Sequence, residues 1–398
     1  MSKGVAVTGM GIISAIGNNV EETLHSLTRQ QTGISEIDYI DTTHKGSIKV
    51  GEIKRSNKEL EEQLGLDDSN NYNRTAMLGA VAAKQACTAA GITDINDCRT
   101  GLISSTSVGG MDMTERYFYE FEKRPETVKY ISSHSAGETT RKIAEQIGIK
   151  GFVTTISTAC SSSANAIMIG ARMIKSGQLD RVIVGGTDAL SKFTINGFNT
   201  LMILTDGYNT PFDNNRKGLN LGEGAAFLVL ESEEIVKKHN REVLAYVSGY
   251  GNANDAFHQT ASSENGEGNY LAMTKALKVA GLQPGQISYI NAHGTATPNN
   301  DLSEGRAILR IFSKEELPLI SSTKPYTGHT LAAAAAIEAV FSILAIRNQL
   351  VYPNLNFQTP MEEFDLIPVT ELKEHKIEHV LSNSFGFGGN CSTLIFSK

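Results

Sequence analysis

Short runs of apolar and β-branched residues alternate with longer, often alanine-rich segments along the whole chain. The short runs predict strands at residues 4–8, 100–104, 152–156, 181–185, 225–230, 243–250, 287–292, 318–321, 379–383 and 392–396. The longer segments predict helices, the clearest at residues 74–90, 161–175, 269–280 and 331–347. Gly91, Gly177 and Gly281 follow the first three, as is typical of helix C-termini. This alternation predicts a mixed α/β fold with buried sheet layers covered by helices.

A polar, helical stretch at residues 231–241 separates two parts of the chain that have a similar order of predicted elements. The similarity suggests a duplicated fold, although we find no sequence repeat that proves it. We therefore expect two halves, residues 1–240 and residues 241–398.

The composition is that of an ordinary globular protein, with 40% hydrophobic and 20% charged residues among 398. The net charge of -7 argues against a nucleic-acid-binding protein. The four cysteines form no Cys-x-x-Cys pair and lack zinc-finger spacing, so we expect no metal. Few cysteines and a start without a signal-peptide pattern predict a cytoplasmic protein. The longest apolar run, 330–346, is short for a membrane span and contains Glu338, so we expect a buried helix.

Cys160 is the best-placed reactive residue. It follows the predicted strand at 152–156 and precedes the predicted helix at 161–175. The free N–H groups and the dipole at a helix start favour a thiolate, and the arrangement is similar to the nucleophile elbow of hydrolases. A buried structural cysteine is the alternative. Cys391 follows a glycine-rich loop and is also a candidate, whereas Cys87 and Cys98 lie in ordinary surroundings.

Two histidines stand after predicted strands, in turns of small residues. His293 lies in NAHGTAT, and His329 lies in STKPYTGH, which also contains Lys324. Ligands in α/β proteins usually bind at such strand ends. A thiolate can accept an acyl group from a thioester, and two imidazole N–H groups can stabilise an enolate oxygen. The set therefore suits acyl transfer followed by carbon–carbon bond formation, with Lys324 supplying positive charge.

The segment SNSFGFGG, at residues 382–389, joins the last two predicted strands. It has no Walker lysine and opens no helix, so it is not a dinucleotide-binding loop. Glycines beside Phe385 and Phe387 suit a gate that excludes water, and a backbone N–H there could complete an oxyanion hole. A plain hairpin with two buried phenylalanines is the alternative.

Together these segments, with TACSSS around Cys160, resemble the β-ketoacyl-[acyl-carrier-protein] synthases with a Cys-His-His triad, and most of all synthase II. The resemblance extends over nearly the whole chain. It implies an α/β, thiolase-like fold of two similar βαβαβαββ halves in a five-layered αβαβα arrangement. It also implies a homodimer, or a heterodimer with a related subunit, that acts with acyl carrier protein. The substrate would be carried on the carrier's phosphopantetheine, with no cofactor bound by the enzyme and no membrane.

The resemblance also assigns roles to residues. Cys160 would accept the acyl group, His293 and His329 would bind the malonyl thioester, and Lys324 would hold His329. The backbone N–H groups of Cys160 and Phe387 would form the oxyanion hole. The other expected site residues are Thr295 and Thr297 at the phosphopantetheine arm, Val108, Met111 and Phe198 in the acyl pocket, and Glu304 as a structural residue near Lys324.

The chain departs from the family pattern in places. Asn390-Cys391 stands where the family usually has Thr-Asn, and acidic Asp67-Asp68 stands where a basic cluster is expected. The remaining candidates for carrier docking are Arg74, Lys123, Arg124 and Lys129. These departures suggest a specialised polyketide or polyene pathway as an alternative to fatty-acid elongation. Two other functions stay open, a non-catalytic chain-length-factor subunit and a thioester hydrolase.

Overall fold

The computed structural model describes residues 4–398, and within them ten strands form one sheet in the order β10-β9-β13-β14-β8-β1-β7-β6-β4-β5. The N-terminal half of the sheet consists of β1 (Val5–Ser14), β4 (Thr100–Ser105), β5 (Phe152–Ile156), β6 (Arg181–Asp188) and β7 (Gly224–Glu231). The C-terminal half consists of β8 (Ala245–Asn254), β9 (Tyr289–Asn291), β10 (Leu319–Ser321), β13 (His379–Phe385) and β14 (Asn390–Ser397).

The two halves have the same topology. In each, the strands numbered along the chain lie in the order third, second, fourth, fifth, first. The second strand pairs in parallel with the third and the fourth, and the fifth is antiparallel to both of its neighbours. The first strands of the two halves join them, because β1 pairs antiparallel with β8 through Val5, Ala6 and Val7. The duplicated fold expected from the order of elements is therefore present in the topology.

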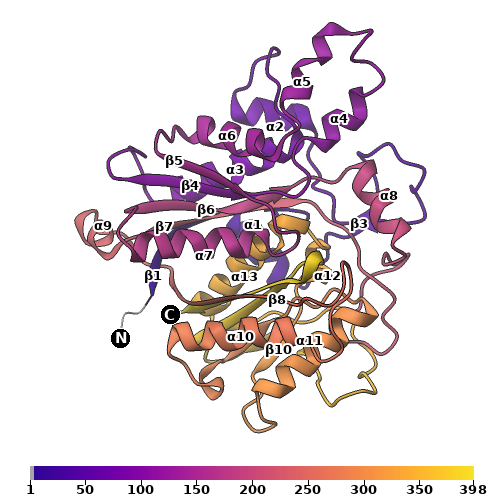
Figure 1. Ribbon diagram of the computed structural model, residues 1–398, viewed down its shortest axis with the longest axis vertical. Helices are drawn as coiled ribbons and strands as arrows, with labels where there is room; N and C mark the ends of the chain where they lie inside the picture. The colour runs from indigo at the N-terminus through magenta and orange to yellow at the C-terminus, as the bar shows by residue number, and fades with distance from the viewer. Residues whose placement is uncertain (1–3) are drawn as a thin grey trace.

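Helices cover and separate the halves of the sheet in five layers (Figure 1). α3 (Arg74–Ala89) and α6 (Ala136–Ile147) cover the N-terminal half on the outside, and α10 (Glu267–Ala280) and α11 (Pro298–Ile311) cover the C-terminal half. α7 (Ser162–Lys175) and α13 (Ala334–Asn348) lie between the two sheet layers. The αβαβα arrangement predicted from the family resemblance is confirmed. The remaining helices are α1 (Val20–Thr28), α2 (Asn57–Leu64), α4 (Met111–Tyr117), α5 (Lys129–Ser132), α8 (Lys192–Thr200), α9 (Glu233–Lys238) and α12 (Lys324–Thr327).

All ten predicted strands are present, and the four clearest helices lie where they were expected. The pattern did not reveal the two-residue strands β2 (Ser35–Glu36), β3 (Lys49–Val50), β11 (Leu350–Val351) and β12 (Lys373–Glu374), which are too short to show alternation. The helix expected at 331–347 begins with a 3₁₀ turn, Leu331–Ala333. The boundary expected at residue 240 falls between β7 and β8, and it stays a prediction.

The most apolar helix lies inside the protein. Leu331–Asn348 is the one segment of residues 4–398 that is long and apolar enough to cross a membrane, and 89% of it is buried. α13 has no polar face because sheet layers and α7 surround it. Glu338 is buried within it, and a buried carboxylate needs a partner.

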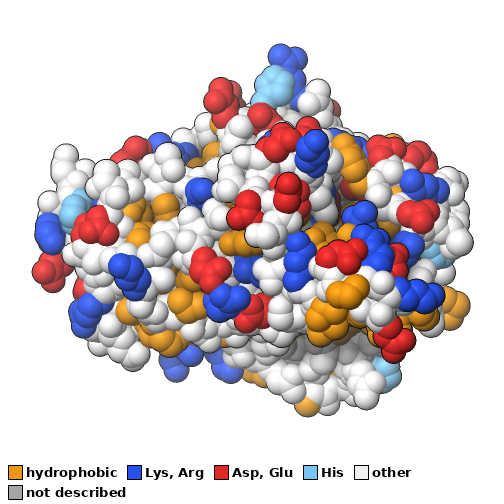
Figure 2. Space-filling view, turned by 90° about the horizontal axis from the view of Figure 1, so that it is seen from above, with side chains coloured by type: hydrophobic (Ala, Val, Ile, Leu, Met, Phe, Trp, Pro, Cys, Tyr) orange, Lys and Arg blue, Asp and Glu red, His pale blue; other side chains and the backbone are white. Residues whose placement is uncertain are grey.

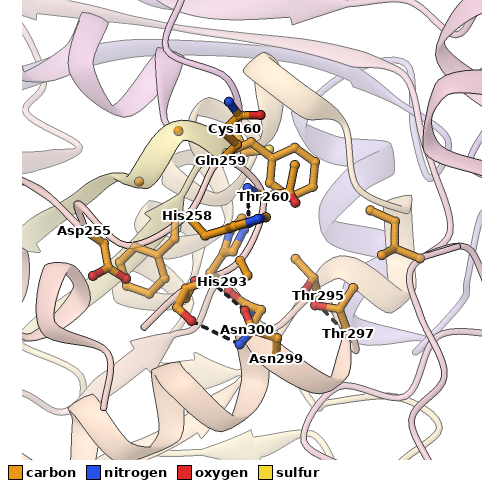
Figure 3. Close-up of a pocket in the computed structure, with 18 of the residues that line it drawn as sticks. Cys160, Asp255, His258, Gln259, Thr260, His293, Thr295, Thr297, Asn299 and Asn300 are labelled. Carbon is orange, nitrogen blue, oxygen red and sulfur yellow. Dashed lines mark hydrogen bonds between the residues drawn. The ribbon is translucent and has the colours of Figure 1, made fainter. Parts of the chain in front are cut away.

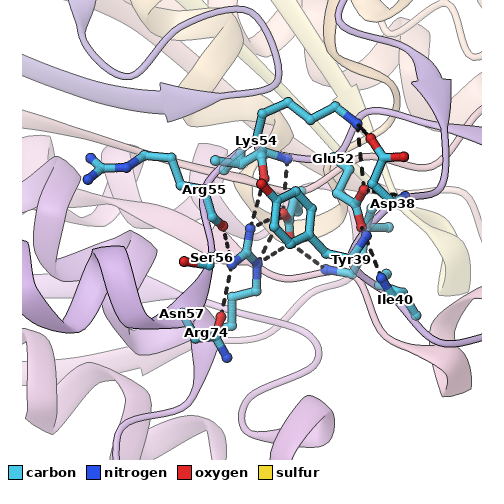
Figure 4. A network of polar contacts seen from close by, with 12 residues as sticks. Asp38, Tyr39, Ile40, Glu52, Lys54, Arg55, Ser56, Asn57 and Arg74 are labelled. Atoms are coloured by element: carbon cyan, nitrogen blue, oxygen red, sulfur yellow. Dashed lines mark hydrogen bonds and ion pairs between the residues drawn. The ribbon is translucent and has the colours of Figure 1, made fainter.

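Arg74 is a structural residue at the start of α3 (Figure 4). Its guanidinium forms a buried ion pair with Glu223, with Nη2 2.6 Å from Oε1. It also donates to the carbonyl oxygens of Ile53 and Arg55, and so attaches that segment to α3. Nearby, the Glu52 carboxylate accepts backbone N–H groups of residues 38–40. The expectation that Arg74 is available to a carrier protein is therefore wrong.

Candidate active site

Cys160 and His329 occupy equivalent places in the two halves of the fold. Cys160 follows β5, the third strand of its half, and precedes α7. His329 follows β10 and α12, and precedes the helical turn that leads into α13. Because α7 and α13 are neighbours in the middle layer, the starts of both helices meet. Ala159 adopts a left-handed conformation, with φ of +51°, which turns the chain sharply before the nucleophile.

The three residues of the expected triad are buried and lie together. His329 Nε2 is 3.0 Å from Cys160 Sγ. The rings of His293 and His329 are nearly perpendicular, with their centroids 5.4 Å apart. His293 reaches this point from the loop after β9, and Phe385 at the end of β13 packs against its ring. The sheet thus brings side chains from four separate strand ends to one place.

Lys324 contacts His293 and not His329, its expected partner. Its ammonium group is 3.3 Å from His293 Nδ1 and 2.6 Å from the Glu338 carboxylate. Both members of the Lys324–Glu338 pair are buried. In the sequence, Glu338 stood out only as a charge that argues against a membrane helix. A lone charge in an otherwise apolar buried helix was the signal that could have identified it as a site residue.

Glu304 supports the His293 loop and does not pair with Lys324. Its carboxylate accepts the backbone N–H groups of His293 and Gly294, at 2.9 and 2.8 Å, and the side-chain amide of Asn383 at 3.0 Å. Burial raises the pKa of Glu304 to about 7, although these hydrogen bonds act to lower it. Glu304 is thus a structural residue next to the site, as expected, but it contacts the His293 loop and not Lys324.

Both histidines are neutral in this environment. Burial, and then the positive charge of Lys324, hold the pKa of His293 and of His329 well below the ordinary value. Each neutral ring has one N–H donor and one nitrogen that can accept a proton. The pair can therefore stabilise a developing oxyanion, and His329 can also receive the Cys160 proton.

The sequence predicted that Cys160 is a thiolate at neutral pH, whereas its surroundings in the structure favour the protonated thiol. Burial raises the pKa of Cys160 to about 12. Lys324 and the backbone N–H groups of Phe387 and Cys160 itself oppose this effect. The two backbone groups are those expected to form the oxyanion hole. The effect of burial on the pKa of Cys160 exceeds that of the helix start, because removal of water disfavours the thiolate more than the helix dipole stabilises it.

We expect alkylation of Cys160 by iodoacetamide to become faster with pH and still to be rising above pH 9, because the buried thiol is protonated at neutral pH. Mass spectrometry of the alkylated peptide, over a pH series, measures this rate. A plateau below about pH 8, under the ordinary value for cysteine, would instead indicate an ion pair of thiolate and imidazolium.

Two pockets meet at Cys160. The entrance pocket, of about 300 Å³, is lined by Cys160, His293, His329, Thr295, Thr297 and residues 258–262 (Figure 3). The second pocket, which we call the acyl pocket after the role expected for its residues, has a volume of about 380 Å³ and is mainly apolar. Its lining includes Val108, Met111, Phe198 and Leu331. Val108, Met111 and Phe198 thus line one pocket together, and Thr295 and Thr297 line the other, while the roles expected for them stay predictions.

Phe387 and Phe198 lie between the two pockets and line both. Their rings are stacked, with centroids 5.9 Å apart. Gly388, next to Phe387, has φ of +80°, and added atoms at its Cβ position would meet no neighbour within 4 Å. A ring on such a loop, between an entrance and a deeper pocket, is suitably placed for the gate expected from the sequence.

A network of amides attaches the gate loop to the cysteine elbow. The side-chain oxygen of Asn390 accepts hydrogen bonds from Ser161, Asn165 and Asn252, at 2.7 to 2.9 Å. Asn390 is one of the positions that depart from the family pattern. Its neighbour Cys391 is buried and donates to Asn269. Asn165 and Asn252 were not predicted as site residues, because their spacing along the chain gives no sign that they meet.

Comparison with known proteins assigns the family. Family models described as the β-ketoacyl synthase N-terminal and C-terminal domains match residues 2–235 and 244–358. The chain is 34% identical to 3-oxoacyl-[acyl-carrier-protein] synthase 2 of Vibrio cholerae, over 99% of both chains. It is 36% identical to the enzyme of that name from Staphylococcus aureus (strain N315), over 100% of this chain and 99% of the relative.

Solved structures agree in fold. The ishigamide ketosynthase/chain length factor has a TM-score of 0.91 and 29% identity, over 100% of this chain and 99% of that one. A ketosynthase in complex with its chain length factor, from Xenorhabdus doucetiae, has a TM-score of 0.85 and 29% identity, over 99% and 98%.

The chain belongs to the β-ketoacyl synthase family. It is an acyltransferase that carries out β-ketoacyl synthase condensation in fatty-acid or polyketide synthesis. The family, the thiolase-like fold class and the enzyme class predicted from the sequence are confirmed.

Proposed function

We propose that this chain is a catalytically complete, elongating 3-oxoacyl-[acyl-carrier-protein] synthase. The observation that supports this most strongly is the meeting of Cys160, His293 and His329 at the junction of an entrance pocket and an apolar pocket. A non-catalytic subunit would not need a buried thiol 3.0 Å from an imidazole.

In the first half-reaction, Cys160 Sγ attacks the carbonyl carbon of an acyl thioester. A new carbon–sulfur bond forms, the bond to the carrier's sulfur breaks, and the thiol proton passes through His329 Nε2 to the leaving thiolate. The backbone N–H groups of Cys160 and Phe387 stabilise the oxyanion of the tetrahedral intermediate. The acyl chain then occupies the pocket beyond Phe387.

In the second half-reaction, malonyl thioester enters through the entrance pocket. Its carboxylate leaves as CO₂, and the electron pair moves to the thioester enolate, whose oxygen accepts N–H donors from His293 and His329. The enolate carbon attacks the acyl carbonyl, a carbon–carbon bond forms and the bond to the Cys160 sulfur breaks. The departing thiolate takes up a proton from water, which restores the Cys160 thiol. Lys324, paired with Glu338, holds the His293 ring in position and favours the neutral imidazole.

Incubation with acyl and malonyl thioesters of acyl carrier protein tests the proposal, with the β-ketoacyl product identified by mass spectrometry. Release of free acid alone would indicate a hydrolase. Turnover that requires a second, related protein would indicate one subunit of a heterodimer, and an acyl adduct without condensation would contradict the proposal.

We also propose that the carrier docks beside Arg216 and Lys217. Arg216 donates to the carbonyl oxygen of Pro298, which lines the entrance pocket, and Lys217 next to it is exposed. On the face seen in Figure 2, by contrast, basic and acidic side chains are interspersed. Arg124, one of the docking residues expected from the sequence, pairs with both Glu120 and Glu126. Lys123 and Lys129 remain weaker candidates than the pair at the pocket.

Lys217→Glu is expected to raise KM for the carrier-bound substrate about 3-fold or more, because carrier proteins of this type are acidic. KM for a small pantetheine thioester should not change. The matched control is Lys237→Glu on α9, at the far side of the molecule. An equal effect on both substrates would mean that Lys217 is not part of a docking surface.

A second subunit is expected to close the acyl pocket. β5 is the outer strand of the sheet, and its Phe152 is 43% exposed. Phe193 on α8 lines the acyl pocket, yet 62% of it is exposed. An unpaired apolar edge strand and an exposed pocket wall both favour a partner. We propose a homodimer, with a chain-length-factor-type subunit as the alternative. The native mass of the purified chain tests this.

Val108→Phe is expected to shift the preference towards short acyl chains, because the added ring would occupy the acyl pocket. The ratio of kcat/KM for long to short acyl substrates should fall about 10-fold or more. Val128→Phe, the same substitution at an exposed position outside the pocket, is the control. An unchanged ratio in the Val108 variant would indicate that the acyl group of the substrate binds outside this pocket.

We propose that the protein acts in the cytoplasm with no resident cofactor or metal, and that phosphopantetheine enters as part of the substrate. The alignment of Thr295 and Thr297 along the entrance pocket, with their hydroxyl oxygens 2.8 Å apart, is consistent with binding of this arm.

A further inference from the structure

Asp188, at the end of β6, is a buried carboxylate outside the Cys-His-His set. Five groups of the described chain donate to it. They are the hydroxyl of Thr106, the hydroxyl of Ser107 at 2.6 Å, and the backbone N–H groups of Ser107, Val108 and Ala332 at 3.0, 3.3 and 2.8 Å. All five donors are uncharged, so hydrogen bonds, and not an ion pair, support the carboxylate. Burial raises the pKa of Asp188, and hydrogen bonds from Ser107, Thr106 and Ala332 act in the opposite direction.

The segments that Asp188 connects belong to different parts of the active site. Ser107 and Val108 form one wall of the acyl pocket. Leu331, which precedes Ala332, forms another part of the wall and has φ of +52°. His329 is only three residues before Ala332, just ahead of the turn Leu331–Ala333. One carboxylate therefore sets the distance between the acyl-pocket wall and the segment that carries a catalytic histidine.

A second contact supports the same junction. The hydroxyl of Ser105 donates to the carbonyl oxygens of Gly185 and Ala332, at 3.1 and 3.3 Å. A Cβ atom on Gly186 would come within 2.4 Å of the Ser105 hydroxyl and 2.9 Å of the Ala332 carbonyl. The end of β6 is thus packed too tightly for the three segments to move independently.

We propose that Asp188 is a positioning residue that holds the Ser107–Val108 wall against the turn after His329, and so determines which acyl chains the enzyme accepts. This rests on the proposed condensing function of the site. A carboxylate suits the position because every neighbour is a donor, whereas the NH₂ group of an amide would face another donor there.

The charge of Asp188 also acts on the nucleophile. It is one of the influences that raise the pKa of the Cys160 thiol, after burial, and Lys324 acts in the opposite direction. His329, which contacts the sulfur, is neutral. Removal of the Asp188 charge should therefore lower the pKa of the Cys160 thiol, an effect that loss of hydrogen bonds without loss of the charge would not have.

The test compares Asp188→Asn with the wild-type enzyme over acyl carrier substrates of increasing length. We expect the kcat/KM ratio of long to short chains to change about 10-fold, and the pH profile of Cys160 alkylation to move to lower pH. A variant with the wild-type chain-length ratio and alkylation profile would overturn the proposal. A uniform loss of activity, in proportion to the loss of folded protein, would overturn it as well.

If Asp188→Asn does not fold, the double variant Thr106→Val, Ser107→Ala removes two donors and keeps the charge. It should change the chain-length ratio several-fold and leave the alkylation profile unaltered, and an unchanged ratio would overturn the proposal. The wild-type assay distinguishes this failure from failure of the proposed function. If the wild-type enzyme condenses substrates and the variants have the same chain-length ratio as the wild type, only the role of Asp188 is refuted.

Discussion

Replacement of Cys160 by alanine is expected to abolish the acyl-enzyme adduct and to lower the rate of condensation by about 10³-fold or more, because no other group takes over from a lost nucleophile. The sulfur is buried at the junction of the entrance and acyl pockets, where a thioester carbonyl can reach it. Intact-mass analysis after incubation with acyl carrier substrate should show one acyl group on the wild-type enzyme and none on the variant.

Cys391→Ser is the matched control. Cys391 is the other buried cysteine that lines the entrance pocket, and burial raises its pKa to about 12 as well. Its thiol has no imidazole partner among the described residues and donates instead to the Asn269 amide. This variant should keep the adduct. An adduct that remains in Cys160→Ala and maps to Cys391 would contradict the assignment.

The second large effect concerns the histidines, which the structure makes unequal. His329 touches the Cys160 sulfur, whereas His293 touches Lys324. His329→Ala is therefore expected to slow both acylation and malonyl decarboxylation, each by about 10²-fold or more, as is typical for loss of an acid–base group. His293→Ala should slow decarboxylation to a similar extent but leave acylation of Cys160 within a few-fold of the wild-type rate.

The sequence alone suggested that acylation would survive loss of either histidine. Two separate assays decide between these outcomes, burst formation of the acyl adduct and release of CO₂ from malonyl carrier substrate. Equal loss of acylation in both variants would argue against a special role for the His329–Cys160 contact. Survival of acylation in His329→Ala would show that the oxyanion hole suffices for this step.

The sequence by itself determined the types of the main elements and the residues that carry the chemistry. Ten strands and four helices were predictable because buried strands are short apolar runs, and because glycines follow three of these helices. Cys160, His293, Lys324 and His329 were identifiable because each lies among small residues at the end of a predicted strand. These are local properties, encoded within a few residues of each position.

Only the tertiary structure decided how these residues are paired and charged. The contact of Lys324 with His293 and Glu338, and the burial of Arg74 against Glu223, join residues from different elements. Spacing along the chain does not encode such contacts, because they depend on how strands and helices that are distant in the sequence pack against one another. The same packing removes water from Cys160 and raises the pKa of its thiol, although its position at a helix start favours the thiolate. Residue type and local position are therefore properties of the sequence, whereas burial, and the protonation state that follows from it, are properties of the fold.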